Sequence, residues 1–192
     1  MAELAKEMDQ AIGAIVDKEG KYLTFSMANE EYGIGILEIK EIIGMMPITP
    51  VPQTPEFVKG VVNLRGKVIP VIDLRLRFGM PSIDYTERTC IIVVEMEEQG
   101  ITVLIGIVVD AVSEVLNIKA GDIEQTPTFG TKLNIDYILG MAKMEGGVKI
   151  LLDISRVLTQ DELASVSKIE KGISPLQSEA QPEQTVVEAP DS

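Results

Sequence analysis

The sequence predicts an all-β fold with short helices, in which two small β-barrels pack together as a pseudo-symmetric pair. Three observations predict it: short apolar runs rich in β-branched residues, hairpin signals between these runs, and a degenerate internal repeat. Apolar residues make up 45% of the 192 residues, and only 4% are aromatic, so we expect a large aliphatic core.

The expected strands are short and are joined by turns that contain glycine or polar residues. Apolar runs on both sides of Arg65-Gly66-Lys67, and again on both sides of residues 97–100, predict two hairpins. Four prolines between residues 47 and 55 mark an irregular crossover. The clearest strand patterns cover residues 22–27, 32–36, 58–64, 68–74, 90–96 and 101–109.

The chain divides into an extension, a folded domain and a tail. Residues 1–19 form the N-terminal extension, where the apolar spacing is typical of a loose amphipathic helix. The domain spans residues 20–166 and has two barrel subdomains, roughly the 20–86 and 87–158 halves, between which strands can cross. We expect residues 167–192 to be a disordered acidic tail, because they carry too little apolar surface to offset the entropy lost on ordering.

Short helices are expected near the ends of the two halves, over residues 74–78, 154–158 and 160–166. For the last of these, Thr159 is the expected N-cap, and Glu162 lies three residues further on, as in a capping box.

The internal repeat has two ordered sets of matches. Gly60, Gly66, Val68 and Asp73 recur at one constant offset as Gly140, Gly146, Val148 and Asp153. Gly33, Ile34, Ile39 and Glu41 recur at another offset as Gly106, Ile107, Val112 and Glu114. Two related modules, each too small for a strong core of its own, are the simplest explanation. Arg65 corresponds to Glu145, and this charge reversal indicates that the two hairpin tips face different surroundings.

Composition excludes several classes of partner and compartment. A net charge of −13 disfavours nucleic acid and anionic membrane surfaces, both of which attract clustered Lys and Arg. The N-terminus lacks the apolar stretch of a signal peptide, and no apolar run approaches the roughly 20 residues that cross a bilayer, so we expect no membrane insertion. The single cysteine, Cys90, precedes a strand pattern and is interpreted as a small core residue. A cytoplasmic, soluble protein is expected.

No catalytic constellation is recognisable. The chain has no histidine, which excludes Ser-His-Asp and Cys-His sites and histidine-ligated metals. Gly33-Ile34-Gly35 lacks the third glycine and the following helix of a nucleotide-binding loop. Paired carboxylates at 30–31 and 97–98 fall in expected turns, and no calcium-binding loop pattern occurs. We therefore expect no catalytic residues, no cofactor and no metal.

Because no catalytic site is expected, we expect the protein to act by binding partners through its surface. If residues 36–43 are extended, Leu37, Ile39 and Glu41 lie on the opposite face from Ile36, Glu38 and Lys40. Both faces then carry apolar residues, so one is core and the other is either an exposed apolar stripe or buried between the barrels. Glu41 and Arg65 are the charges most suited to orient a partner.

Four segments stand out in order over about residues 20–160: EEYGIGILEIKEI, FVKGVVNLRGKVIPVIDLRLRFG, IGIVVDAVSEVL and ILLDISRVL. In sequence and in order, these segments resemble the CheW family of chemotaxis coupling proteins. GVVNLRG followed by PVIDLR is the most specific part.

The resemblance implies a fold of two five-stranded, Src-homology-3-like barrels and a non-enzymatic adaptor. Family members couple the cytoplasmic tip of methyl-accepting chemotaxis receptors to the regulatory domain of the histidine kinase CheA, and they are recruited to membrane receptor arrays. The positions that match the family's receptor-facing surface are Ile39, Glu41, Arg65, Gly106 and Val112, with Asn63 and Gly66 shaping the hairpin tip, and together these seven are the predicted partner-binding residues.

Two other functions are alternatives to the adaptor. A small-molecule sensory barrel without a kinase partner would use an apolar pocket at the barrel junction, but the sequence offers no convergent polar groups for it. An enzyme with unrecognised carboxylate chemistry would lose its activity on single Asp or Glu substitutions.

Overall fold

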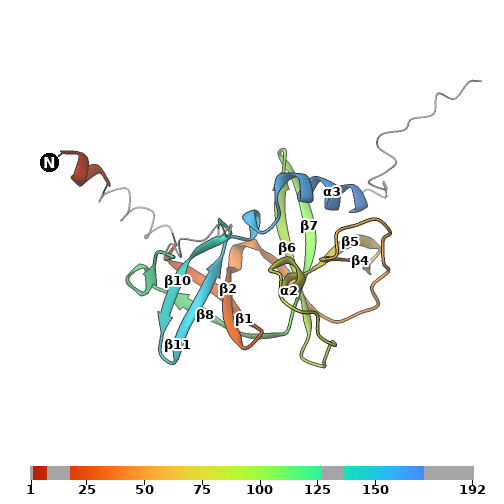
Figure 1. The fold of residues 1–192 in the computed structure, drawn as a ribbon, viewed down its shortest axis with the longest axis horizontal. Coiled ribbons are helices and arrows are strands. Elements are labelled where there is room, and N and C mark those ends of the chain that lie inside the picture. Colours follow the sequence, from red (N-terminus) through yellow and green to blue (C-terminus); the bar gives the residue numbers. More distant parts are fainter. Residues whose placement is uncertain (1, 8–17, 127–135, 171–192) are drawn as a thin grey trace, which may run out of the picture.

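The computed structural model describes residues 2–7, 18–126 and 136–170, and most of these residues belong to two β-sheets (Figure 1). The strands are β1 (Gly20–Met27), β2 (Glu30–Gly35), β3 (Ile39–Gly44), β4 (Val58–Leu64), β5 (Lys67–Asp73), β6 (Cys90–Glu98), β7 (Ile101–Val109), β8 (Ala111–Ile118), β9 (Ile123–Glu124), β10 (Ile138–Met144) and β11 (Gly147–Leu152). The short helices are η1 (Ile36–Glu38), α2 (Leu74–Arg77), η2 (Ala120–Asp122), η3 (Ile154–Arg156) and α3 (Gln160–Glu170). Residues 2–7 are also helical.

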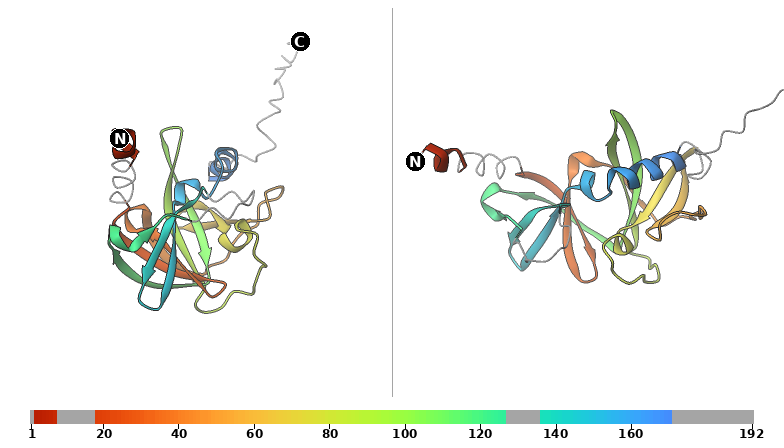
Figure 2. Two further views of the ribbon diagram at one scale, coloured as in Figure 1. Left: turned by 60° about the vertical axis from the view of Figure 1, so that its left-hand side comes forward. Right: turned by 45° about the horizontal axis from the view of Figure 1, so that its top comes forward.

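The two sheets form the pair of small barrels that the sequence predicts. The first sheet has the strand order β8-β1-β2-β11-β10-β9, where β9 has only two residues, and the second has the order β3-β6-β7-β5-β4. Both sheets are strongly curled, and they lie next to each other with α3 running along the second (Figure 2). All six strand patterns recognised in the sequence correspond to strands of the structure.

The two barrels do not correspond to the two halves of the chain. The first sheet takes its strands from residues 20–35 and 111–152, and the second takes its strands from residues 39–109. The expected division into 20–86 and 87–158 is therefore wrong as a division into barrels, and the strand crossing that the sequence left open is what the topology contains. The reason is that β5 pairs in parallel with β7, and β11 pairs in parallel with β2, so each repeat supplies strands to both sheets.

The two copies of the repeat share individual backbone contacts. Gly60 and Gly140 each follow a register shift at the start of a hairpin strand, and in both places a neighbouring backbone lies very close. A Cβ on Gly60, where φ is +140°, would lie 2.0 Å from the Thr49 carbonyl oxygen. A Cβ on Gly140 would lie 2.8 Å from the Glu124 carbonyl oxygen. Both positions require glycine for the same reason, namely the close approach of another chain segment.

The parallel pairs that join the repeats also require glycine. Gly106 lies opposite Val71, and its counterpart Gly33 lies opposite Leu151. A Cβ on Gly106 would be 2.8 Å from Ile91 Cγ2, and a Cβ on Gly33 would be 2.9 Å from Leu151 Cδ2. The matching glycines thus leave space for the side chains of the barrel interiors.

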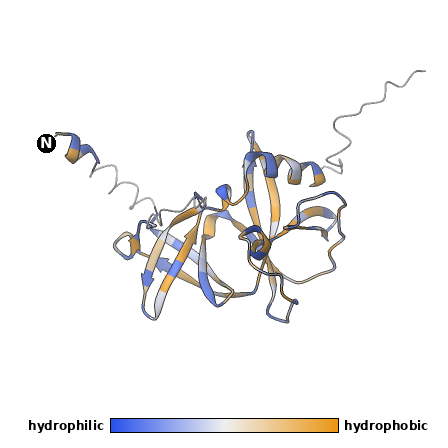
Figure 3. Ribbon diagram, viewed as in Figure 1, coloured by the Kyte–Doolittle hydropathy of each residue, from blue (hydrophilic) through white to orange (hydrophobic). Residues whose placement is uncertain are grey.

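The continuous apolar runs of β6 and β7 reflect strands that are buried on both faces (Figure 3). Along β6, Ile92 and Val94 pack in a core shared by the two sheets, whereas Ile91 and Val93 pack inside the second barrel. Successive side chains of a strand point to opposite faces, so one strand contributes to both cores. A third core, around Tyr22, Ile118 and Leu151, lies in the first barrel.

Side-chain caps define the predicted short helices. Asp73 begins α2 by accepting hydrogen bonds from the Arg75 and Leu76 amides, and its repeat counterpart Asp153 accepts one from the Ser155 amide. For α3, the Thr159 amide donates to the Glu162 carboxylate (2.8 Å) and the Glu162 amide donates to the Thr159 hydroxyl (3.2 Å). The predicted capping box is therefore confirmed.

Two boundary predictions need correction. The helix α3 continues to Glu170 because Val166 and Ile169 are buried in the shared core, so residues 167–170 belong to the domain and not to the tail. Residues 36–38 form a 3-10 turn and not a strand, and Leu37 is 92% exposed on it. Residues 171–192 and most of the N-terminal extension lie outside the described residues.

An ion pair lies where the chain passes from the second sheet to the first. Asp110 separates β7 from β8, and its carboxylate accepts hydrogen bonds from Arg75 Nε at 2.7 Å and from Arg75 Nη2 at 2.6 Å. It also accepts the Ala28 amide at 3.0 Å. Burial alone would raise the pKa of Asp110, but these hydrogen bonds outweigh it, so the pKa is lowered from its usual value.

Candidate partner-binding groove

The site begins at the hairpin between β4 and β5. Arg65 and Gly66 both have positive φ, +52° and +84°, as a tight two-residue hairpin requires. The Asn63 side chain accepts a hydrogen bond from the Gly66 amide at 2.8 Å, which fixes the turn. Asn63 and Gly66 therefore shape the tip, and the Arg65 side chain, which is 72% exposed, extends from it.

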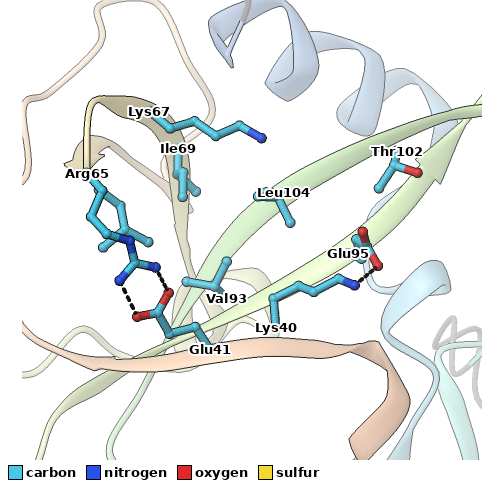
Figure 4. Close-up of a pocket in the computed structure, with 10 residues that line it drawn as sticks. Lys40, Glu41, Arg65, Lys67, Ile69, Val93, Glu95, Thr102 and Leu104 are labelled. Carbon is cyan, nitrogen blue, oxygen red and sulfur yellow. Dashed lines mark hydrogen bonds and ion pairs between the residues drawn. The ribbon is translucent and has the colours of Figure 1, made fainter.

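Arg65 reaches back across the sheet to Glu41 on β3 (Figure 4). Its Nη1 donates to Glu41 Oε1 at 3.0 Å, and its Nη2 donates to the other carboxylate oxygen, so the contact is bidentate. The hydrogen bond from Arg65 lowers the pKa of Glu41, and the same bond raises the pKa of Arg65. Both groups stay in contact with water, which suits a docking element more than a fold-stabilising one.

These two residues border a groove of about 680 Å³ on the second barrel. Its apolar lining consists of the partly exposed Leu64 and Leu104 together with Ile69 and Val93, which are each only 1% exposed. Its polar rim comes from Lys40, Glu41, Arg65, Lys67, Glu95 and Thr102. The apolar residues lie next to the barrel core, because Val93 and Ile69 belong to it and Leu64 and Leu104 pack against it. The arrangement combines an apolar surface with charges at its border, which is the usual form of a protein-binding site.

The structure brings together some of the predicted site residues and separates others. Glu41 and Arg65 line the groove, and Asn63 and Gly66 hold its hairpin. Gly106 is buried in β7 beside Val93, below the groove surface. It supports the site without lining it.

Ile39 and Val112 are also outside the groove. Ile39 is half-buried on β3, and Val112 lies on β8 of the first sheet, opposite Phe25. Both pack against the shared core, as the repeat would place them, but neither reaches the groove.

Sequence reasoning missed the apolar surface and three charged residues of the rim, Lys40, Lys67 and Glu95. Glu95 carried a signal, because it is the first charge after the apolar run Ile91–Val94 and shares a strand face with Val93. No signal in the sequence indicated that Lys40 lines the groove, because in a regular strand its side chain would lie on the face opposite Glu41.

The residues that line the groove include no cysteine or histidine. In the described ranges there is no group of three or more Cys, Asp and Glu side chains that could hold a metal ion. Cys90 is half-buried at the start of β6. Helices long and apolar enough for a bilayer crossing are also absent from the described part of the chain.

Comparison with known proteins identifies the family. The model of the CheW-like domain matches residues 21–162. The chain belongs to the CheW-like family. The chemotaxis protein CheW of Klebsiella aerogenes is 39% identical over 171 residues, which cover 89% of this chain and 99% of the relative. The CheW of Helicobacter pylori is 35% identical over 142 residues, which cover 73% and 82%.

A solved structure supports the same assignment. The crystal structure of the scaffolding protein TtCheW from Thermoanaerobacter tengcongensis superposes with a TM-score of 0.66 at 36% identity. The match covers 75% of this chain and 97% of that protein. The CheW-like fold is thus established both by sequence and by structure, and the groove described above lies within the matched domain.

Proposed function

We propose that this chain, a CheW-family chemotaxis adaptor, couples the cytoplasmic tip of methyl-accepting chemoreceptors to the regulatory domain of the histidine kinase CheA. Membership of the family supports the adaptor role, and the groove on the second barrel is the observation that carries the receptor-binding part. The protein would act in the cytoplasm, recruited to receptor arrays at the membrane by these contacts.

The groove suits an amphipathic helix. Its apolar surface can bury one stripe of such a helix, while the bidentate Glu41–Arg65 pair at the rim can exchange hydrogen bonds with polar groups beside that stripe. Charges at a rim fix orientation and exclude wrong partners more than they add affinity. The chain would supply geometry to the kinase and receptor, and no chemical step.

A small-molecule sensory module is not favoured. The relatives are named chemotaxis or scaffolding proteins. Glu41 pairs with Arg65 and Lys40 pairs with Glu95 at the rim of the groove, so these four charges do not converge on a point within it, as they would around a small polar ligand.

The test is the charge reversal Arg65→Glu. We expect it to abolish or strongly weaken binding to a purified receptor-tip fragment and receptor-dependent CheA activity, because it places two carboxylates side by side at the rim. The melting temperature should stay within a few degrees of wild type, because Arg65 is 72% exposed. Arg88→Glu is the matched control, since Arg88 is exposed and does not line the groove. Wild-type coupling by Arg65→Glu would refute the site.

A further inference from the structure

A bulge in β3 turns a second charged side chain into the groove. Ile39 pairs with Val94 and Glu41 pairs with Val93, so Lys40 is an extra residue with no partner in the β6 register. In a regular strand the side chains of Lys40 and Glu41 would point to opposite faces. Because of the bulge both line the groove, which contradicts their expected separation onto two faces (Figure 4).

Lys40 uses this position to pair with Glu95. The Lys40 Nζ lies 2.7 Å from Glu95 Oε2, and the two side chains are 48% and 36% exposed. A pair this exposed adds little to the stability of the fold. The charges of Lys40 and Glu95 are therefore available to a partner that enters the groove.

The two ion pairs lie on opposite sides of the groove. Glu41 and Arg65 are on one side, Lys40 and Glu95 are on the other, and Val93 and Leu104 lie between them (Figure 4). With Lys67, the rim holds three cations and two carboxylates, a net charge of +1 on a chain whose net charge is −13. The rim is thus a locally basic border on an acidic protein, and Lys40 is its cation on the β3–β6 side.

We propose that the Lys40–Glu95 pair is a specificity element of the groove, which selects an amphipathic helix that carries a carboxylate beside its apolar stripe on the Lys40 side. Such a helix buries apolar residues at i, i+3 or i+4, and i+7 against Leu64 and Leu104, the partly exposed apolar residues of the groove. The carboxylate of the helix replaces Glu95 as the ion-pair partner of Lys40. The other side of the helix contacts Glu41 and Arg65. A helix with a cation at that position is rejected, because it would face the ammonium of Lys40 at close range.

This inference rests on the proposed function, and the experiment separates the two. The protein is titrated with a fluorescent receptor-tip hairpin. The affinity for this hairpin is compared between wild type, Lys40→Glu and the double swap Lys40→Glu/Glu95→Lys. We expect Lys40→Glu to lower affinity tenfold or more with an unchanged melting temperature. The double swap restores an internal ion pair of reversed polarity, and we expect its affinity to remain at least tenfold low.

Two further variants make the result specific. Each carboxylate beside the apolar stripe of the hairpin is changed to lysine in turn. We expect one of these changes to weaken binding to wild type and to recover binding to the double swap. Lys143→Glu/Glu124→Lys is the matched control, because this exposed pair belongs to the first sheet, away from the groove. We expect it to stay within twofold of wild type.

The outcomes divide clearly. If the double swap binds the hairpin as wild type does, the pair has only a structural role and the inference is overturned. If wild type binds, Arg65→Glu loses binding and neither Lys40 variant changes it, the proposed function stands and the inference fails. If wild type itself binds no receptor tip, the proposed function fails.

Discussion

The ion pair between Arg75 and Asp110 offers the sharpest test of how the two barrels are held together. Arg75 follows β5 of the second sheet, and Asp110 lies where the chain enters the first. Asp110 also accepts the amide of Ala28 in the β1–β2 turn, so one carboxylate joins three segments. The change Asp110→Asn keeps the size of the side chain and removes its charge, so the Arg75 guanidinium loses the carboxylate with which it is paired.

The magnitude follows from burial. The side chains of Arg75 and Asp110 are 13% and 23% exposed. Removing one partner of a fully buried pair costs about 3–5 kcal/mol, and the remaining water contact lowers this, so we expect a loss of about 2–3 kcal/mol. For a chain of this size, each kcal/mol shifts the melting temperature by about 2–4 °C, which predicts a decrease of roughly 4–12 °C.

Urea unfolding of wild type, Asp110→Asn, Arg75→Met and the double variant gives a thermodynamic cycle. Asp84→Asn, at an exposed loop position, is the control and should change stability by no more than about 0.5 kcal/mol. The pKa of Asp110 is lowered in the folded state. Its contribution to the free energy of unfolding is therefore fully present above the pKa that it has in the unfolded chain, and is lost as pH falls through its pKa in the folded state. An Asp110→Asn loss below about 1 kcal/mol, or a cycle with additive effects, would refute the reasoning.

Two other predictions concern pH and backbone space. Burial, and then the charge of Asp153, raise the pKa of Glu38 to about 7, so between about pH 4.5 and 7 the folded state holds a proton that the unfolded chain releases. The free energy of unfolding should therefore decrease as pH rises through this window, and Glu38→Gln should remove that decrease; parallel urea-unfolding profiles would contradict it. Gly60→Ala should cost more than about 3 kcal/mol, because its Cβ would overlap the Thr49 carbonyl at a positive φ. Gly140→Ala should cost less, about 1–2 kcal/mol, and thermal melts showing the opposite order would disprove the comparison.

Local features of the fold were readable because they depend on neighbouring residues. Gly66 lies in a predicted hairpin turn, and Thr159 with Glu162 forms a predicted capping box. The repeat was also readable, and its paired residues Asp73 and Asp153 cap equivalent helices. Short-range hydrogen bonds and φ preferences act within a few residues, so the sequence carries them directly.

The candidate site was only partly predictable. Glu41 and Arg65 were predicted both from their charges and from the resemblance, and the structure places them in contact across 24 residues of chain. The groove between them could not be predicted, because its apolar surface consists of residues whose type is typical of any buried strand. Val93, for example, differs from Val94 only in which face it occupies.

Apolar patterning, turn residues and the internal repeat establish that this protein is built of β-strands, that its two halves are related, and which hairpins and caps it uses. Which sheet each strand joins, and where Lys40 points, depend on the packing of the whole domain. Strands that are apolar on both faces carry no mark of their partner, so long-range pairing such as β5 with β7 is settled by how the cores pack together. A one-residue bulge then places the Lys40 side chain on the groove side of β3, which changes the set of residues that line the groove.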